Sequence, residues 1–370
     1  MSHRYPSLAA ALLAILLPFP ALAADDAPSI VKRPDSFFTS DAGRHDVDNL
    51  LTWQGVGPGN VMAWPKAYPL TKSRQEDASR KLEWDGIATI DNGATYSELR
   101  ILARAITLNA STDDPDGTRA AQLKRWTDAF YKGLDAVLDA QYPNGGWPQR
   151  FPPDAPNQMP YAKHITFNDN AMTRLMVELQ AIATQSAPYA FVDDAHRQRA
   201  AKAFDKGIEC ILNCQITLNG KLTGWCAQHD EVTLKPAGGR AYELPSISGQ
   251  EGAEIALLLM DQPHPSARMK AAIDAAAAWF DSAKITDKQS LSITAPDGKK
   301  DRILADAPGH TIWARFYDLQ TGQPLFAGRD GQPKTAMADV ERERRTGYSW
   351  YGNWGEKVAK AYAKWKKREG

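Results

Sequence analysis

The feature that most constrains the fold is a turn carrying one large aromatic residue directly after a helical segment. The turn is QYPNGGWPQ, residues 141–149, and its Asn-Gly and Gly-Gly pairs adopt positive φ angles at little cost. A degenerate copy with Asn219-Gly220 and Gly224-Trp225 follows another helical segment. A recurring helix–turn–tryptophan unit predicts a fold of repeated helical hairpins. Each tryptophan can close a helical core or stack on a sugar ring, and the turn alone leaves both roles open.

Helical spacing of apolar residues recurs along the chain, whereas strand signals are few and short. The stretches with helical spacing are 96–108, 123–138, 172–182, 204–212, 252–260, 271–280 and 354–365. The best strand candidates are Ile303-Leu304 and 311–317, and residues 24 to about 50 are polar and loop-like. Long loops such as 150–160 and 231–248 connect the helices, and no Pro/Ser linker divides them. We therefore expect one mostly helical domain over residues 24–370, arranged as a ring of hairpins.

The first residues have the pattern of a secretory signal peptide. A short basic lead is followed by an apolar stretch from Leu8 to Leu22 and by the small-x-small site Ala21-Leu22-Ala23. We expect cleavage after Ala23 and export to the periplasm or the medium. No later segment is apolar enough to span a bilayer, so no membrane association is expected.

The charges exclude one class of partner, and the cysteines leave several possibilities open. The 44 basic and 44 acidic residues balance, so no basic excess is available for nucleic acid or an acidic membrane surface. We expect a monomer. In an oxidising compartment Cys226 can pair with Cys210 or Cys214, which leaves one odd thiol. A metal site of the three thiols with His229 is the less favoured alternative.

Two segments place more oxygen ligands before a helix than capping requires. They are IDNGAT, which contains Asp91 and Asn92, and KHITFNDNAM, which contains Asp169. A single Asp or Asn suffices to cap the free N–H groups of a helix. Carboxylate and amide oxygens together also suit Ca²⁺. Both interpretations remain open from the residues alone.

Two arginines lie in settings that favour binding of a carboxylate. Arg240 follows two glycines and lies beside Tyr242 and Glu243, and Arg315 lies within the aromatic segment WARFY. A guanidinium held by stacking can bind a carboxylate with its planar fork. The alternating charges of 341–345, which include Arg344 and Arg345, are better explained as structural. An exported protein with carboxylates and arginines on its loops suggests a polyanionic substrate that a cation bridges to the protein.

Several long segments, in order, resemble the family 10 polysaccharide lyases, which are pectate lyases. They are YPNGGWPQRFP, HITFNDNAM, GWCAQHDEVTLKPAGGRAYELPSISG, WARFYDLQTGQPLFAGRDG and ERERRTGYSWYGNWGE, within about residues 80 to 360. The resemblance implies an all-α fold, an (α/α)₃ toroid of helical hairpins with long loops and few short strands. It also implies Ca²⁺-assisted anti β-elimination on polygalacturonate, which yields 4,5-unsaturated products.

The resemblance also implies roles for individual residues. Asp91, Asn92 and Asp169 match positions that contact Ca²⁺ or substrate, and we expect the two aspartates to bind the metal. Arg240 matches the catalytic base. The expected substrate-binding residues are Asn92, Arg315, Arg329 and, through stacking, Trp147. Asp230 is a further candidate that the resemblance does not settle.

An arginine base poses an energetic problem, because its pKa exceeds about 12 and little is neutral at pH 7. A neighbouring cation and partial desolvation would both favour the neutral form. Two rival functions remain. One is an exported glycoside hydrolase on a helical toroid, which would use two carboxylates. The other is a non-catalytic polygalacturonate-binding protein that displays Trp147 and Trp225.

Overall fold

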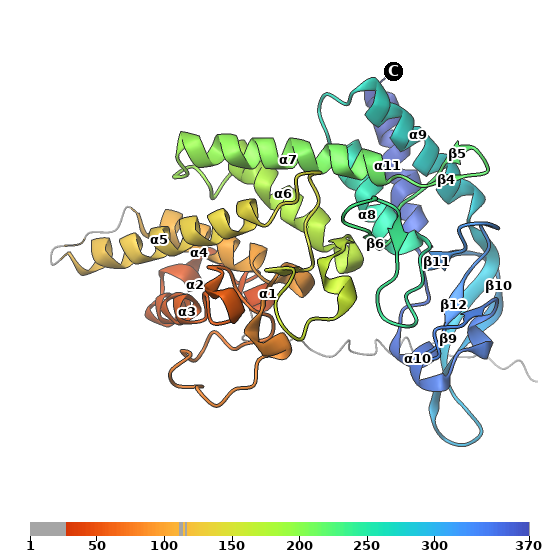
Figure 1. Ribbon diagram of the computed structural model, residues 1–370, viewed down its shortest axis with the longest axis horizontal. Coiled ribbons are helices and arrows are strands. Elements are labelled where there is room, and N and C mark those ends of the chain that lie inside the picture. Colours follow the sequence, from red (N-terminus) through yellow and green to blue (C-terminus); the bar gives the residue numbers. More distant parts are fainter. Residues whose placement is uncertain (1–26, 111–113, 115–116, 370) are drawn as a thin grey trace, which may run out of the picture.

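The computed structural model describes residues 27–110, 114 and 117–369, so the expected leader 1–23 lies outside the described residues. Two rows of helices run along the long axis of the molecule, and a long β-hairpin lies at one end (Figure 1). The first row consists of α3 (Asp41–Thr52), α5 (Thr118–Asp139), α7 (Asp194–Cys214) and α9 (Ala267–Ser282). The second row consists of α4 (Tyr96–Asn109), α6 (Ala171–Ala183), α8 (Gly249–Met260) and α11 (Trp354–Glu369). Within each row every helix contacts the next.

Shorter elements complete the described chain. The remaining helices are α1 (Ala27–Ile30), α2 (Asp35–Thr39) and α10 (Arg342–Gly347). The long hairpin is formed by β9 (Ile285–Thr294) and β10 (Lys300–Ala314), and β14 (Tyr351–Gly352) pairs with the other edge of β10. Two further two-stranded pairs are β4 (Thr217–Leu218) with β5 (Lys221–Leu222), and β12 (Phe326–Ala327) with β13 (Pro333–Lys334). In the described part of the chain, no helix is long and apolar enough to cross a membrane.

A buried tryptophan ties each first-row helix to the loop that follows it. The indole Nε1 donates to a backbone carbonyl near the end of the helix in four cases: Trp64 to Leu50 at 3.0 Å, Trp147 to Val137 at 2.9 Å, Trp225 to Ile211 at 2.7 Å and Trp313 to Phe280 at 2.8 Å. Each loop then leads towards a second-row helix. The helix–turn–tryptophan repeat predicted from two copies is therefore present in four.

A glutamine links each of the first three units to the next. The side-chain amide of Gln141 donates to the Gly145 carbonyl in its own loop at 3.0 Å and to Ala203 in α7 at 2.8 Å. Equivalent pairs of bonds are made by Gln54, to Met62 and Ala129, and by Gln215, to Thr223 and Ala272. The turn itself packs tightly on α7, because a Cβ on Gly145 (φ +92°) would lie 2.0 Å from the Lys206 carbonyl oxygen.

Three short strand pairs give the starts of α4, α6 and α8 the same setting. β1 (Ala88–Thr89) pairs with β2 (Arg150–Phe151), β3 (Ile165–Thr166) with β6 (Gln228–His229), and β8 (Ile247–Ser248) with β11 (Phe316–Tyr317), while β7 (Pro236–Ala237) extends the second pair. All three pairs are antiparallel. In each, the strand before a second-row helix pairs with the strand that follows the next buried tryptophan. The loops that enter these three helices are therefore held at one edge of the row.

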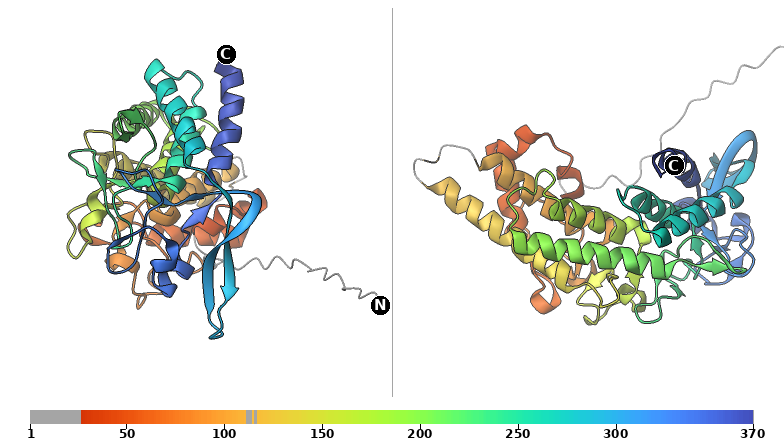
Figure 2. Two further views of the ribbon diagram at one scale, coloured as in Figure 1. Left: turned by 90° about the vertical axis from the view of Figure 1, so that its right-hand side faces the viewer. Right: turned by 90° about the horizontal axis from the view of Figure 1, so that it is seen from above.

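The prediction of an all-α (α/α)₃ toroid with few short strands is wrong. Of the described residues, 48% are helical and 15% lie in strands, and the tryptophan-linked helices form four units instead of three. The first and last units lie at opposite ends of the long axis, in a curved arc (Figures 1 and 2). The two strand candidates are confirmed: Ile303-Leu304 and residues 311–314 lie in β10, and residues 316–317 form β11. The full length of the hairpin and its first strand β9 are not predicted by the pattern, because both faces are largely exposed and apolar residues such as Leu291 and Ile303 do not alternate cleanly with polar ones.

The prediction of a loop over residues 24 to about 50 is also wrong. Ser40 caps α3 by accepting a hydrogen bond from the Gly43 N–H at 3.1 Å, and Val47 and Leu50 bury the inner face of the helix. Charged residues surround these few apolar positions, so the helical spacing was too sparse to detect. By contrast, the seven predicted helical stretches all fall within α4 to α9 and α11.

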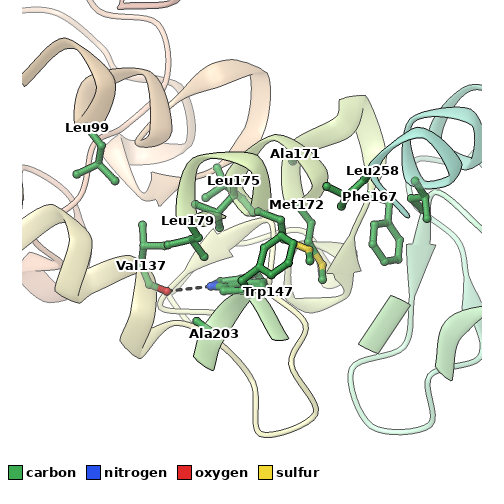
Figure 3. Close-up of a cluster of buried hydrophobic side chains, with 14 of the residues drawn as sticks. Leu99, Val137, Trp147, Phe167, Ala171, Met172, Leu175, Leu179, Ala203 and Leu258 are labelled. Atoms are coloured by element: carbon green, nitrogen blue, oxygen red, sulfur yellow. Dashed lines mark hydrogen bonds between the residues drawn. The ribbon is translucent and has the colours of Figure 1, made fainter. Parts of the chain in front are cut away.

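Trp147 belongs to the hydrophobic core, so its expected role in stacking on a sugar ring is wrong. Its side chain is fully buried among Val137, Met172 and Leu175, with the indole N–H turned to the Val137 carbonyl (Figure 3). Trp225 is equally buried. A ring without an exposed face cannot stack on a ligand, so neither tryptophan supports the non-catalytic binding function.

Replacement of Trp147 by Phe tests this structural role. The variant loses the indole–carbonyl bond and leaves a small void, so we expect the free energy of unfolding to fall by about 2–4 kcal/mol. Urea denaturation measures this loss, and Trp225→Phe should behave alike because it makes the equivalent bond. The KM for substrate should stay within twofold of wild type. A raised KM without a loss of stability would contradict the assignment to the core.

Candidate active site

Three carboxylates lie together where α4, α6 and α8 begin. Asp91 is in η3 (Asp91–Gly93), Asp169 is in η5 (Asn168–Asn170), and Glu251 is in the first turn of α8. η3 contacts η5, and the Asp169 backbone N–H donates to Glu251 Oε1 at 3.2 Å. We call these three residues the carboxylate cluster. The positive ends of three helix dipoles point towards it, which favours anionic groups there.

Asp91 is the more buried of the two expected metal ligands, and one of its carboxylate oxygens has no hydrogen-bond partner among the described residues. Its Oδ2 accepts from the Asn92 amide at 2.9 Å and lies 3.8 Å from Lys66 Nζ, whereas its buried Oδ1 has no hydrogen-bond partner. Burial raises the pKa of Asp91 to about 6; Lys66 opposes this shift, and the charge of Asp169 adds to it. A buried carboxylate oxygen without a donor is a position where a cation fits.

The capping interpretation of Asp91 and Asp169 fails. Neither α4 nor α6 has a side-chain cap hydrogen bond, and Asn92 and Asp169 both adopt left-handed backbone angles, each with φ of 50°. In α8, by contrast, Ser248 caps the helix by accepting from the Glu251 N–H at 3.2 Å. Neither aspartate is therefore used to cap its helix.

Arg315 lies inside the carboxylate cluster. Its Nη2 is 2.7 Å from Glu251 Oε1 and 3.3 Å from Asp169 Oδ1, and its Cζ lies 4.6 Å from the centre of the Tyr348 ring. Burial alone would lower the pKa of Arg315, but Glu251 and the neighbouring anions raise it instead. The structure thus brings Arg315 to Asp169, and its Nη2 contacts both carboxylates, while its buried Nε has no hydrogen-bond partner among the described residues.

Arg240 lies beside the cluster and is held in its charged form. Its Nε donates to Glu243 Oε2 at 3.0 Å, a second bond joins Nη2 to Glu243 Oε1, and the Tyr348 hydroxyl donates to the same Oε1 at 2.8 Å. Burial lowers the pKa of Arg240, yet the bonds to Glu243 outweigh burial and raise it. Arg240 and Arg315 lie over the same aromatic ring, with their Cζ atoms 5.7 and 4.6 Å from the centre of the Tyr348 ring, and the charge of Arg240 lowers the pKa of Asp91. Burial favours the neutral guanidine, as expected, but Glu243 outweighs this effect and favours the charged form.

Arg329 lies on the rim, outside the cluster. Its guanidinium is exposed and pairs with Glu343 through two contacts of 3.0 Å. Glu343 also pairs with Arg344, whose Cζ lies 4.8 Å from the Tyr242 ring. In the described residues, no hydrogen bond or ion pair connects Arg329 to the carboxylate cluster.

Other candidates have structural partners. Asp230 Oδ1 accepts from the N–H groups of Val232 and Thr233 and so closes its own turn. Arg345 binds Asp301 through Nε at 2.6 Å, which agrees with a structural role. His229 uses both ring nitrogens on backbone groups, and burial lowers its pKa to about 4.

The three cysteines are free and buried, so no disulfide joins Cys226 to Cys210 or Cys214 in this structure.

Sequence reasoning missed four polar residues at the site: Glu251, Glu243, Tyr348 and Lys66. Glu251 follows Ser248 by three positions, and this spacing indicates a helix cap. The sequence therefore contains no separate indication that Glu251 contacts Arg315. Glu243 follows Arg240 by three positions, which was a usable signal for an ion pair. Tyr348 and Lys66 come from distant loops, and no local pattern identifies them.

Comparison with known proteins agrees with this architecture. The family model described as pectic acid lyase matches residues 59–359. A family 10 polysaccharide lyase from Cellvibrio cellulosa is 30% identical in sequence to this chain. The match covers 93% of this chain and 98% of the Cellvibrio chain, and the two structures superimpose with a TM-score of 0.71. An aspartate-to-alanine mutant from the same organism, solved in complex with trigalacturonic acid, has the same identity and coverage and a TM-score of 0.70. No curated protein matches the sequence at a significant level.

Fold and site together define a polysaccharide lyase. More narrowly, the chain belongs to the pectic acid lyase family and is a pectate lyase.

The raised pKa of Asp91 predicts a stability change with a definite sign. The pKa of about 6 in the folded protein exceeds the ordinary aspartate value of 3.8, so deprotonation between these values favours the unfolded chain. Asp91→Asn should therefore stabilise the metal-free protein at pH 7, by up to about 3 kcal/mol. The gain should shrink towards pH 4. Thermal unfolding in chelator at both pH values measures it, and a variant that is less stable at pH 7 would contradict the burial of an unpaired carboxylate.

Proposed function

We propose that this pectate lyase cleaves polygalacturonate by Ca²⁺-assisted anti β-elimination, with Arg240 as the base. The observation that carries the proposal is the buried, unpartnered Oδ1 of Asp91 close to Asp169. Oxygen-only donors of this kind suit Ca²⁺, and Asp91 and Asp169 would hold it, with Asn92 beside them. The bound cation would offset the negative charge that develops on the uronate carboxylate.

The substrate assignment is supported by charge and by the relative solved with a ligand. The Cellvibrio cellulosa mutant was in complex with trigalacturonic acid. In the present chain Arg240 and Arg315 lie next to the carboxylate cluster, so cationic groups are in place for a uronate carboxylate. Arg329, on the rim, would bind a carboxylate only further along the substrate.

The proposed elimination requires no oxidant or reductant. The C5 proton passes to the base, the C5–H electron pair forms the C4=C5 double bond, and the C4–O bond breaks. The leaving oxygen takes a proton from water. Arg240 can accept the C5 proton only in its neutral form, so its bonds to Glu243 must weaken when substrate and cation bind. Glu243 would then set the position of the guanidine and also restrain its deprotonation.

We further propose export through residues 1–23, on the basis of the leader pattern alone. N-terminal sequencing of the protein recovered outside the cytoplasm should begin at Ala24. A mature protein that still begins at Met1 would overturn this proposal.

Metal dependence is the first functional prediction. Excess chelator should abolish the rise in near-ultraviolet absorbance that the unsaturated product gives on polygalacturonate. Ca²⁺ should restore turnover better than Mg²⁺, which demands stricter octahedral geometry. Asp169→Asn should require more Ca²⁺ for half-maximal rate while its circular dichroism stays that of wild type. Full activity in chelator would exclude a catalytic cation.

The second prediction concerns the base. Arg240→Lys keeps a positive charge but loses the reach and the planar fork, so we expect kcat to fall by about 10³-fold or more, with a smaller change in KM. Because only neutral Arg240 can accept the C5 proton, kcat should rise with pH above neutrality. Glu243→Gln removes the anion that holds Arg240 charged, so this rise should move to lower pH. An Arg240→Ala enzyme with near-normal kcat would show that another residue removes the proton. An unshifted pH profile in Glu243→Gln would contradict the link between the two residues.

A further inference from the structure

A second buried arginine lies beside the carboxylate cluster. Arg150 is in β2, where its backbone pairs with Thr89, two positions before Asp91. The residue is only 2% exposed, and its Cζ lies 3.5 Å from the centre of the Trp84 ring. Its guanidinium is therefore fixed by stacking against an aromatic face, close to the proposed metal-binding carboxylate.

Arg150 has no acidic partner. In the described residues, no hydrogen bond or ion pair joins its guanidinium to another group, and its Nε is buried without a partner. Arg315, the other buried arginine there, contacts both Glu251 and Asp169. The two buried arginines thus differ in that one is neutralised by the protein and the other is not.

The acidic groups nearest to Arg150 do not neutralise it by direct contact. Burial lowers the pKa of Arg150, and Tyr161, Asp91 and Glu83 oppose that shift without coming within ion-pair distance. An unpaired buried charge is destabilising by several kcal/mol. The presence of Arg150 beside the carboxylate cluster is explained if a ligand supplies the missing carboxylate.

The platform that holds Arg150 is itself built with strain. Trp84 and Asp85 are consecutive non-glycine residues in the left-handed region, with φ of 54° and 53°, a conformation that is unfavourable for residues with a Cβ. Lys66 Nζ lies 4.8 Å from the Trp84 ring and 3.3 Å from Glu83 Oε2. The Trp84 ring at this strained turn therefore contacts both this lysine and Arg150.

We propose that Arg150 is a further substrate-binding residue, which pairs with a uronate carboxylate of polygalacturonate next to the cation held at Asp91. This inference rests on the proposed function. The planar fork stacked on Trp84 suits two parallel bonds to a carboxylate, which a neutral methyl ester cannot accept equally. Arg150 would therefore contribute to the discrimination between free and esterified uronate.

The test compares Arg150→Met with Arg199→Met, an exposed arginine on α7 that pairs with Asp135 and Asp139. Arg150→Met should raise KM for polygalacturonate at least tenfold and change kcat less than threefold. It should also weaken calorimetric binding of trigalacturonate by a similar factor. Its melting temperature should equal or exceed that of wild type, since an unpaired buried charge is removed. Arg199→Met should leave KM and binding unchanged.

Two results would contradict the inference. A lower melting temperature with unchanged KM would assign Arg150 a purely structural role. If Arg150→Met does not fold, Arg150→Lys keeps the charge but not the fork; raised KM there supports the inference, and unchanged KM overturns it. A wild-type enzyme that binds trigalacturonate but gives no unsaturated product would overturn the elimination mechanism and leave the binding measurement valid.

Discussion

The side-chain amide of Gln141 donates to two carbonyls at once, one in its own loop and one in the next first-row helix. The same pair of bonds recurs at Gln54 and Gln215, and each is accompanied by a buried tryptophan that donates to the preceding helix. These bonds set the spacing of successive units. Because the strands that enter α4, α6 and α8 pair with the strands that follow the tryptophans, the same bonds also position the carboxylate cluster.

The electrostatics of the site are incomplete without a ligand. Asp91 has a buried oxygen without a donor and a pKa raised to about 6, and Arg150 has a buried guanidinium without an anion. A cation at the first position and a uronate carboxylate at the second would neutralise both. Binding would then recover free energy that the folded protein lacks in the metal-free state. Arg240 differs, because Glu243 already satisfies it and must release it for catalysis.

The sequence was sufficient for the helices and for part of the site. Strong apolar spacing located α4 to α9 and α11, and long motifs identified Asp91, Asp169, Arg240 and Arg315, which the structure brings together. Periodicity could not tell whether Trp147 faces the core or a ligand, since both need the same turn. The missing partner of Arg150 depends on the position of Trp84, which lies in a distant loop. Glu251 was not identified as a site residue because helix capping by Ser248 already explains a glutamate at its position.

The most direct test of the central claim is a crystal structure of the Arg240→Ala variant with Ca²⁺ and trigalacturonate. We predict one Ca²⁺ ion bound by Asp91 Oδ1 and Asp169, with a uronate carboxylate completing its coordination. The described residues contain one alternative group that could hold a metal, His164, Asp230 and Glu231. A Ca²⁺ ion found there, with no metal between Asp91 and Asp169, would contradict the account.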